Sequence, residues 1–192
     1  MDGSLLLWIN QGWAHPWLDV YFELVSAKAG FSFPLMALII VALGLRYGVA
    51  GWRVGLGLLV LVVFGDAFGN LLKDGFGMPR PCLDWAAQLR GLGDSLFIGC
   101  EVSNSGMPSN HALNFFSTFV FMSLVLRRWY WTTLFLLLAV SVGLSRIYLG
   151  SHFPSQVLVG ALIGAAWGGV FSWICVRHFD FMRQVWQQRS AA

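Results

Sequence analysis

Three short stretches of this sequence place cationic side chains and imidazoles at the ends of apolar segments. In chain order they hold Lys73 and Arg80, then Ser109, Asn110 and His111, then Arg146 and His152. Charge within an apolar chain is costly unless it serves a function. Lysine and arginine bind phosphoryl oxygens, and arginine offers planar, paired donors for them. The pattern therefore predicts one phosphate site at a membrane surface.

The residue types also predict how a phosphate would be held. Lys73, Arg80 and Arg146 can neutralise its non-bridging oxygens. Ser109 follows a proline and precedes a long apolar run, which favours a helix N-cap. Its hydroxyl and the backbone N–H groups near Asn110 would then form a helix N-terminus that stabilises an anion.

His111 and His152 are a candidate acid and nucleophile pair. A single histidine in an apolar chain is more often structural. Two of them, each next to a phosphate-binding candidate and at the same inferred membrane face, favour catalysis.

The three stretches resemble, in order and spacing, the motifs of the type 2 phosphatidic acid phosphatase superfamily. Those motifs are normally K-x6-R-P, P-S-G-H and S-R-x5-H-x3-D. Here they read Lys73-x6-Arg80-Pro81, Pro108-Ser109-Asn110-His111 and Ser145-Arg146-x5-His152, and they span positions 73–156. The resemblance implies a six-helix membrane bundle and a metal-independent lipid phosphate phosphatase that needs no cofactor.

By the same resemblance, His152 attacks phosphorus to form a phosphohistidine, and His111 protonates the leaving oxygen. The phosphate is held by Lys73, Arg80, Ser109 and Arg146, with backbone donors near Asn110. Water then hydrolyses the intermediate. The sequence has no His, Asp and Glu cluster at metal-ligand spacing, in keeping with this expectation.

Two positions depart from the family pattern. Asn110 replaces a glycine, which a helical backbone would tolerate, and Gln156 replaces the aspartate that orients the nucleophile. The Gln156 amide oxygen can accept a hydrogen bond from His152 but brings no charge. We therefore expect Gln156→Asp to speed phosphorylation roughly tenfold, about 1.4 kcal/mol of barrier. The competing idea is that Asp66 or Glu101 supplies the missing carboxylate.

The composition determines which elements must position these residues. Of the 192 residues, 57% are hydrophobic and 11% are charged, far from the roughly 25% charged residues of soluble domains. We expect an all-α integral membrane protein, a six-helix transmembrane bundle with a short interfacial N-terminal helix, and a single domain over 1–192. The expected spans are Ala29–Leu45, Val54–Leu72, Ala112–Leu126, Trp129–Ser145 and Phe153–Val176, with a weaker sixth, tilted or short, within Leu5–Lys28.

Smaller patterns refine this bundle. Asp66, Asn70 and Lys73 share one helix face, where structural pairing is favoured over catalysis. Glycines recur every four residues from Gly160 to Gly168, which indicates close packing inside the bundle. A disulfide between Cys82 and Cys100 and two free thiols are equally favoured.

Arginines in three loops predict the orientation. By the positive-inside rule, the connections around Arg46, Arg127 and Arg177 are cytoplasmic. Six alternating spans would then put both termini in the cytoplasm and the site on the outer face of a bacterial cytoplasmic membrane.

We expect the partners to be this membrane and a lipid phosphate, with no nucleic acid. Undecaprenyl diphosphate is favoured over phosphatidylglycerophosphate, because compact bacterial members of the family often recycle the polyprenyl carrier. A lipid phosphotransferase and a catalytically dead lipid-phosphate binding protein are the alternatives.

Overall fold

The apolar runs form helices throughout the residues that the computed structural model describes, which are 1–90 and 105–190. The elements are α1 (Asp2–Gly12), α2 (Pro16–Ser26), a π-helical turn (Lys28–Ser32), α3 (Phe33–Phe76), α4 (Pro81–Asp84), a 3-10 turn (Ala86–Gln88), α5 (Asn110–Leu126), α6 (Trp129–Tyr148), α7 (Pro154–His178) and α8 (Phe181–Ser190). The expected all-α class is confirmed, because every regular element in these ranges is helical.

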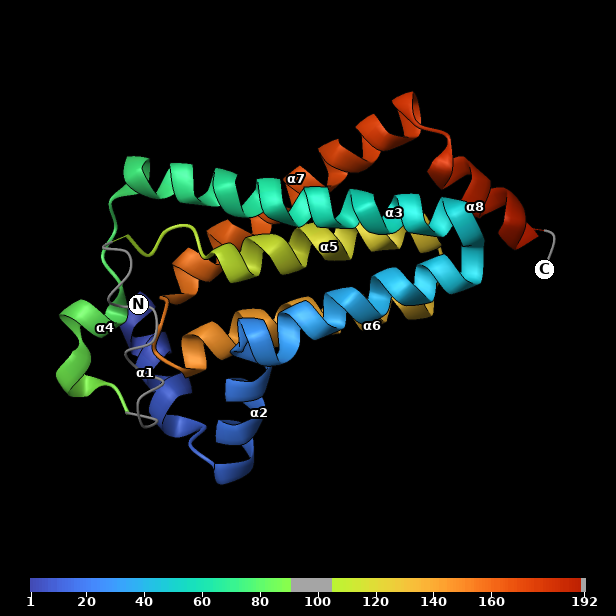
Figure 1. The fold of residues 1–192 in the computed structure, drawn as a ribbon. Coiled ribbons are helices and arrows are strands. Elements are labelled where there is room, and N and C mark those ends of the chain that lie inside the picture. The colour runs from blue at the N-terminus through green and yellow to red at the C-terminus, as the bar shows by residue number, and fades with distance from the viewer. Residues whose placement is uncertain (91–104, 191–192) are drawn as a thin grey trace.

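The helix labelled α3 is a hairpin of two antiparallel arms (Figure 1). The first arm covers 28–47 and includes the π-helical turn, and the second arm covers 49–76. Gly48 makes the reversal at φ 59° and ψ −136°, a left-handed conformation open to a residue without Cβ. Gly51 lets the arms meet, because a Cβ there would overlap the carbonyl oxygen of Leu43. The second and third predicted spans are these two arms.

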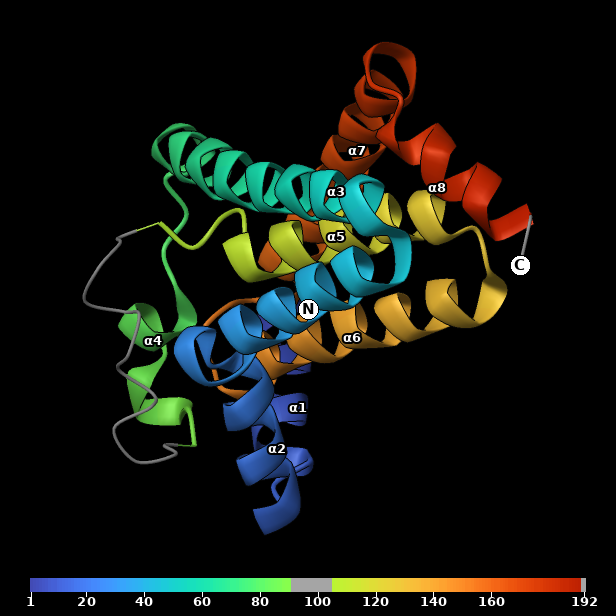
Figure 2. The same cartoon turned by 45° about the vertical axis from the view of Figure 1, so that its right-hand side comes forward.

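Five apolar helical segments lie side by side in the bundle, namely the two arms of α3, α5, α6 and α7 (Figures 1 and 2). The stretches Lys28–Phe76, Trp129–Tyr148 and Pro154–His178 are long and apolar enough to cross a membrane. Helix α5 has 17 residues, about 26 Å at 1.5 Å per residue, near the lower limit for a span. The chain is therefore an integral membrane protein.

Helix α7 packs closely against α5 along the glycine face that the sequence indicated. A Cβ on Gly160, Gly164 or Gly168 would overlap the carbonyl oxygens of Ser109, Leu113 and Ser117, respectively. Small residues let two helix backbones approach closely within a membrane. The contact fixes the start of α5 beside the start of α7, and both helix starts carry candidate site residues.

The predicted count of six spanning helices is not confirmed. Helices α1 and α2 have 11 residues each, about 16 Å apiece, which is too short to cross a bilayer. Asp2 accepts a hydrogen bond from the backbone N–H of Ser155 (3.0 Å) at the start of α7. At the opposite end, α8 donates from Trp186 Nε1 to the Val125 carbonyl (3.1 Å).

The two chain ends consequently lie at opposite ends of the bundle (Figure 1). Five crossings would leave the ends on opposite sides of a membrane, whereas two cytoplasmic termini require an even number of crossings. The orientation of the termini stays a prediction, and it depends on whether the broken apolar stretch of 5–28 is counted as a span.

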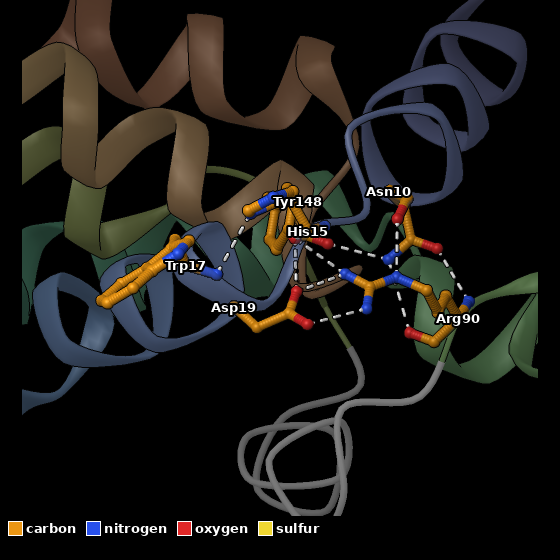
Figure 3. Close-up of polar contacts among 6 residues, drawn as sticks. All are labelled: Asn10, His15, Trp17, Asp19, Arg90 and Tyr148. Atoms are coloured by element: carbon orange, nitrogen blue, oxygen red, sulfur yellow. Dashed lines mark hydrogen bonds and ion pairs between the residues drawn. The ribbon is translucent and has the colours of Figure 1, made fainter.

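A polar cluster ties α1 and α2 to the rest of the protein (Figure 3). Its members are Asn10, Asp19, Arg90 and Tyr148, and we call it the Arg90 cluster. The Arg90 guanidinium donates to both carboxylate oxygens of Asp19 (2.6 and 3.1 Å) and to the Tyr148 hydroxyl (2.8 Å). Asn10 accepts from the Arg90 N–H (2.7 Å) and donates to the Tyr148 carbonyl (2.7 Å). The cluster joins four segments that are distant in sequence.

Two expectations involve residues outside the described ranges. Cys100 and Glu101 both belong to 91–104, so a Cys82–Cys100 disulfide and a role for Glu101 stay predictions. Cys175 is a free, buried thiol on α7.

Candidate phosphate site

The three motifs meet at one end of the bundle, each at the end of a helix. Lys73 lies in the last turn of α3, Arg80 caps α4, Ser109 caps α5, Arg146 lies in the last turn of α6, and His152 lies in the turn before α7. These five residues are buried, with at most 9% of each exposed. The structure thus places these five candidate side chains at one end of the bundle, and their roles stay predictions.

The turn between α6 and α7 places His152 next to Arg146. The backbone N–H groups of Ser151 and His152 both donate to the Arg146 carbonyl, at 3.0 and 3.1 Å. Gly150 makes the turn possible with a left-handed φ of 67°. His152 is 2% exposed, so its imidazole is held inside the protein.

Gln156 connects all three motifs. Its side-chain oxygen Oε1 lies 3.2 Å from His152 Nδ1 and accepts from the Phe153 N–H at 3.2 Å. Its Nε2 donates to the carbonyl of Pro79, the residue before Arg80, at 2.8 Å. Its backbone carbonyl accepts from the Ser109 N–H at 3.1 Å. The completely buried Gln156 side chain thus acts as a hub.

These contacts define the tautomer of His152. Only the NH2 end of the Gln156 amide can donate to the Pro79 carbonyl, so the amide oxygen faces the imidazole. His152 must then donate from Nδ1, which leaves a lone pair on Nε2. Burial, followed by the charges of Arg146 and Arg80, lowers the pKa of His152 well below its ordinary value. A neutral imidazole with a free Nε2 is the form that a nucleophile requires.

Five buried polar atoms of the motifs have no hydrogen-bond partner in the described part of the chain. They are Arg80 Nε, Ser109 Oγ, Asn110 Oδ1, His111 Nε2 and Arg146 Nε. Buried polar groups are normally paired, and an unpaired one costs about 1–3 kcal/mol. An anion with several acceptor oxygens would satisfy donors that come from three separate helix ends.

The charges at the site also favour an anion. Desolvation by burial lowers the pKa of Arg80, as expected for a cation that is removed from water. Salt bridges within 1–90 and 105–190 include one between Arg90 and Asp19, outside the site, and none to Lys73, Arg80 or Arg146.

Asn110, the first departure from the family pattern, lies in the first turn of α5, where its backbone is helical. Its side-chain amide donates to Asp66 Oδ1 (3.0 Å) and to Asn70 Oδ1 (2.8 Å). Asn70 Oδ1 also accepts from Lys73 Nζ at 3.2 Å. The amide fits because Gly69 has no Cβ, which would contact the Asn110 side chain.

Asp66 therefore belongs to a structural network. Its carboxylate accepts from the amides of Asn110 and Asn114, and Asn70 connects it to Lys73. The predicted structural role is present, although it runs through an amide rather than a direct ion pair. The carboxylate is held by Asn110 and Asn114 while Gln156 contacts His152, so the idea that Asp66 orients the nucleophile is wrong.

The α2–α3 junction also reaches the site, which the sequence did not indicate. The Ser26 hydroxyl accepts a hydrogen bond from Arg146 Nη1, and the Ser26 backbone lies next to His111. Lys28, two residues later, lies beside the same cavity as His111. The one available signal was that Lys28 interrupts an apolar stretch and is one of two lysines in the chain.

That cavity has a volume of about 350 Å³ and lies between the two arms of α3 and α5. Most of its wall is apolar. Its polar lining residues are Lys28, Ser32, Asp66, Asn110, His111, Asn114 and Thr118. Phe33, Leu59 and Val63 line it and are 58%, 38% and 56% exposed. The cavity therefore opens sideways on the outer surface of the bundle.

Comparison with known proteins agrees with the motifs. The PAP2 superfamily model matches residues 54–180. The chain is 29% identical, over 202 aligned positions and its full length, to a dihydrosphingosine 1-phosphate phosphatase of Schizosaccharomyces pombe, of which it covers 45%. It is 28% identical over 182 residues to a lipid A 4'-phosphatase of Bacteroides thetaiotaomicron, covering 91% of this chain and 76% of that protein.

The fold is similar to the crystal structure of a transmembrane PAP2-type phosphatidylglycerolphosphate phosphatase from Bacillus subtilis. The TM-score is 0.69 at 21% identity, covering 92% of this chain and 87% of the other. The chain spans less than half of the first relative and about three quarters of the second. All three motifs lie inside the matched region, whereas Ser26 and Lys28 precede it.

Proposed function

The chain belongs to the PAP2 superfamily, and from this premise we propose that it is a membrane phosphatase that hydrolyses a lipid phosphate or diphosphate. The observation that carries the proposal is the environment of His152, whose free Nε2 shares one buried site with unpaired donors of Arg80, Ser109 and Arg146. The phosphatase names of the relatives support an enzyme over a lipid-phosphate binding protein.

In the proposed reaction, His152 Nε2 attacks phosphorus while the bond to the leaving oxygen breaks. Lys73, Arg80 and Arg146 stabilise the charge on the three equatorial oxygens, with Ser109 as a further donor. His111 gives its proton to the leaving oxygen. Water then attacks the phosphohistidine, His111 takes up a proton from this water, and phosphate and free His152 are released.

The cavity beside His111 supports a lipid substrate. Its apolar wall and sideways opening suit a hydrocarbon chain that enters from the membrane while the phosphate reaches the buried donors. Among lipids we propose undecaprenyl diphosphate. A phosphatidylglycerophosphate is the second candidate, favoured by the activity named for the solved relative of similar fold.

We also propose that the site faces the outside of a bacterial cytoplasmic membrane. The opposite end of the bundle carries Arg46 and Arg53 around the α3 turn and Arg127 and Arg128 between α5 and α6. Cytoplasmic loops carry such an excess of arginine. The carboxyl terminus would then be cytoplasmic, and the amino terminus would lie on the side of the site.

Release of phosphate from purified protein in detergent tests the activity. We expect release from undecaprenyl diphosphate or phosphatidylglycerophosphate, with and without a chelator, and none from a His152→Ala variant. Release that depends on an added lipid acceptor would indicate a phosphotransferase. Tight binding of these lipids without any release would indicate a binding protein and contradict the proposal.

A further inference from the structure

Lys28 is a cation that contributes no side-chain hydrogen bond or ion pair to the described part of the fold. It begins the π-helical turn Lys28–Ser32 after α2, and its side chain is exposed. Within the described ranges it makes no side-chain hydrogen bond and no ion pair. The second lysine of the chain, Lys73, is by contrast buried and bonded to Asn70.

The position of Lys28 is defined relative to His111. Both residues line the cavity between the α3 arms and α5. Ser26, two residues before Lys28, lies next to His111, so this junction lies on the His111 side of the site.

The carboxylate of Asp66 also lines this cavity but is already engaged. It accepts hydrogen bonds from the amides of Asn110 and Asn114. Among the described residues that line the cavity, the ammonium group of Lys28 is therefore the charge that no hydrogen bond or ion pair engages, and it lies next to an apolar wall.

A cation at this place distinguishes two kinds of leaving group. On the proposed function, His111 faces the oxygen that leaves. A lipid monophosphate releases an alcohol, which is neutral once His111 has protonated it. A lipid diphosphate breaks at the bond between the terminal phosphorus and the bridging oxygen, and that oxygen leaves on a lipid monophosphate, which is an anion.

We propose that Lys28 binds the second phosphate of a lipid diphosphate, the one that departs with the lipid, while the hydrocarbon chain occupies the apolar cavity. This inference rests on the proposed function and narrows its substrate class. Lysine acts as a point charge for phosphate, so the contact tolerates an approach from different directions.

Binding of two non-hydrolysable ligands tests the subsite directly. An alkyl methylenediphosphonate and an alkyl phosphonate with the same chain would be titrated by calorimetry into the wild type, Lys28→Gln, Lys28→Arg and Arg53→Gln. Arg53 is an exposed cation at the far end of the bundle and serves as the matched control. We expect Lys28→Gln to lower the affinity for the diphosphonate about tenfold, or about 1.4 kcal/mol of binding free energy. The affinity for the phosphonate should fall less than twofold. Lys28→Arg and Arg53→Gln should leave both affinities nearly unchanged.

Equal weakening of both ligands, or no weakening, would overturn the role of Lys28. Hydrolysis of the matching prenyl diphosphate and monophosphate by the same variants separates this outcome from failure of the proposed function. Wild type that binds both ligands but hydrolyses neither substrate would refute the phosphatase, and the affinities alone would then decide the subsite. If the wild type hydrolyses both substrates and Lys28→Gln leaves the ratio of diphosphate to monophosphate hydrolysis unchanged, the subsite alone would be refuted.

Discussion

Gln156 contacts the proposed nucleophile, His152, with one end of its amide and the Pro79 carbonyl with the other. Its oxygen accepts from His152 Nδ1, and its NH2 group donates to the Pro79 carbonyl. An aspartate at this position would bring the missing charge but no donor. Rate and stability should therefore respond in opposite directions to this substitution.

We predict that Gln156→Asp raises the phosphorylation rate about tenfold and lowers the free energy of unfolding by about 1–3 kcal/mol, because the Pro79 carbonyl loses its partner. Gln156→Leu should lose both stability and rate, since no group then orients His152. Rapid-quench kinetics and thermal unfolding in detergent measure the two effects. Unchanged rates in both variants would mean that Gln156 does not act on the nucleophile.

Ser26 is predicted to be a positioning residue for Arg146. Its hydroxyl accepts from Arg146 Nη1, and Ser26→Ala removes this acceptor while the backbone contact to His111 stays. We expect weaker phosphate binding, seen as a KM raised about fivefold to tenfold, or about 1–1.4 kcal/mol, with kcat changed less than twofold.

Ser26→Thr keeps the hydroxyl and should restore KM. A drop in kcat with an unchanged KM, or a failure of threonine to rescue, would show that Ser26 acts on Arg146 in some other way or not at all.

At the scale of elements, the contact between α5 and α7 holds the site together. The glycine face of α7 lies against the backbone of α5, and the helix starts carry Ser109 and Gln156. The Ser109 N–H donates to the Gln156 carbonyl across this contact (3.1 Å). A displaced α7 would thus move the proposed nucleophile, His152, relative to Ser109 and the other groups proposed to bind the phosphate.

We predict that Gly164→Ala destabilises the protein by about 1–3 kcal/mol, because its Cβ would overlap the Leu113 carbonyl oxygen. Gly169→Ala on the same helix is the matched control, since a Cβ there meets no atom within 4 Å. Thermal unfolding in one detergent compares the two. Equal stability of both variants would contradict the close packing of α5 and α7.

At the scale of the whole molecule, the Arg90 cluster attaches the two short N-terminal helices to the bundle. The hydrogen bond from Arg90 lowers the pKa of Asp19 below its ordinary value. A carboxylate with a lowered pKa in the folded state contributes stability above its ordinary pKa of about 3.9. The contribution is lost as the pH falls through the lowered folded-state value.

A double-mutant cycle with Arg90→Met and Asp19→Asn should give a coupling energy of about 1 kcal/mol at pH 7. The coupling should disappear when unfolding is measured below the lowered folded-state pKa of Asp19, because its carboxyl group is then protonated. A coupling that persists there, or none at pH 7, would contradict the bidentate pair in Figure 3.

Long apolar runs and motif spacing were enough to predict most of this molecule. Helices α5, α6 and α7 begin and end within a few residues of the predicted spans, because unbroken apolar stretches have few other solutions in a membrane. The motif residues, which the sequence places at the ends of apolar runs, lie at helix ends at one end of the bundle.

The remaining features depend on contacts between distant segments. Whether residues 5–28 form one span or two short helices is decided by the Arg90 cluster and by packing on α6, which no local pattern reveals. Pro79, Ser26 and Lys28 reach the site through a backbone carbonyl, a helix end and a cavity wall. The residue types of Pro79 and Ser26 gave no reason to choose them, and the one signal for Lys28 was a lysine that interrupts an apolar stretch.

The measurement that tests the central claim most directly is the trapping of phosphate on His152. Wild type quenched during turnover with labelled lipid phosphate or diphosphate should carry an acid-labile phosphohistidine, which peptide mapping should locate at His152. His111→Ala should form it more slowly, His178→Ala at the far end of α7 should form it normally, and His152→Ala should not form it. Label that persists in His152→Ala would contradict the assignment of the nucleophile and, with it, the proposed mechanism.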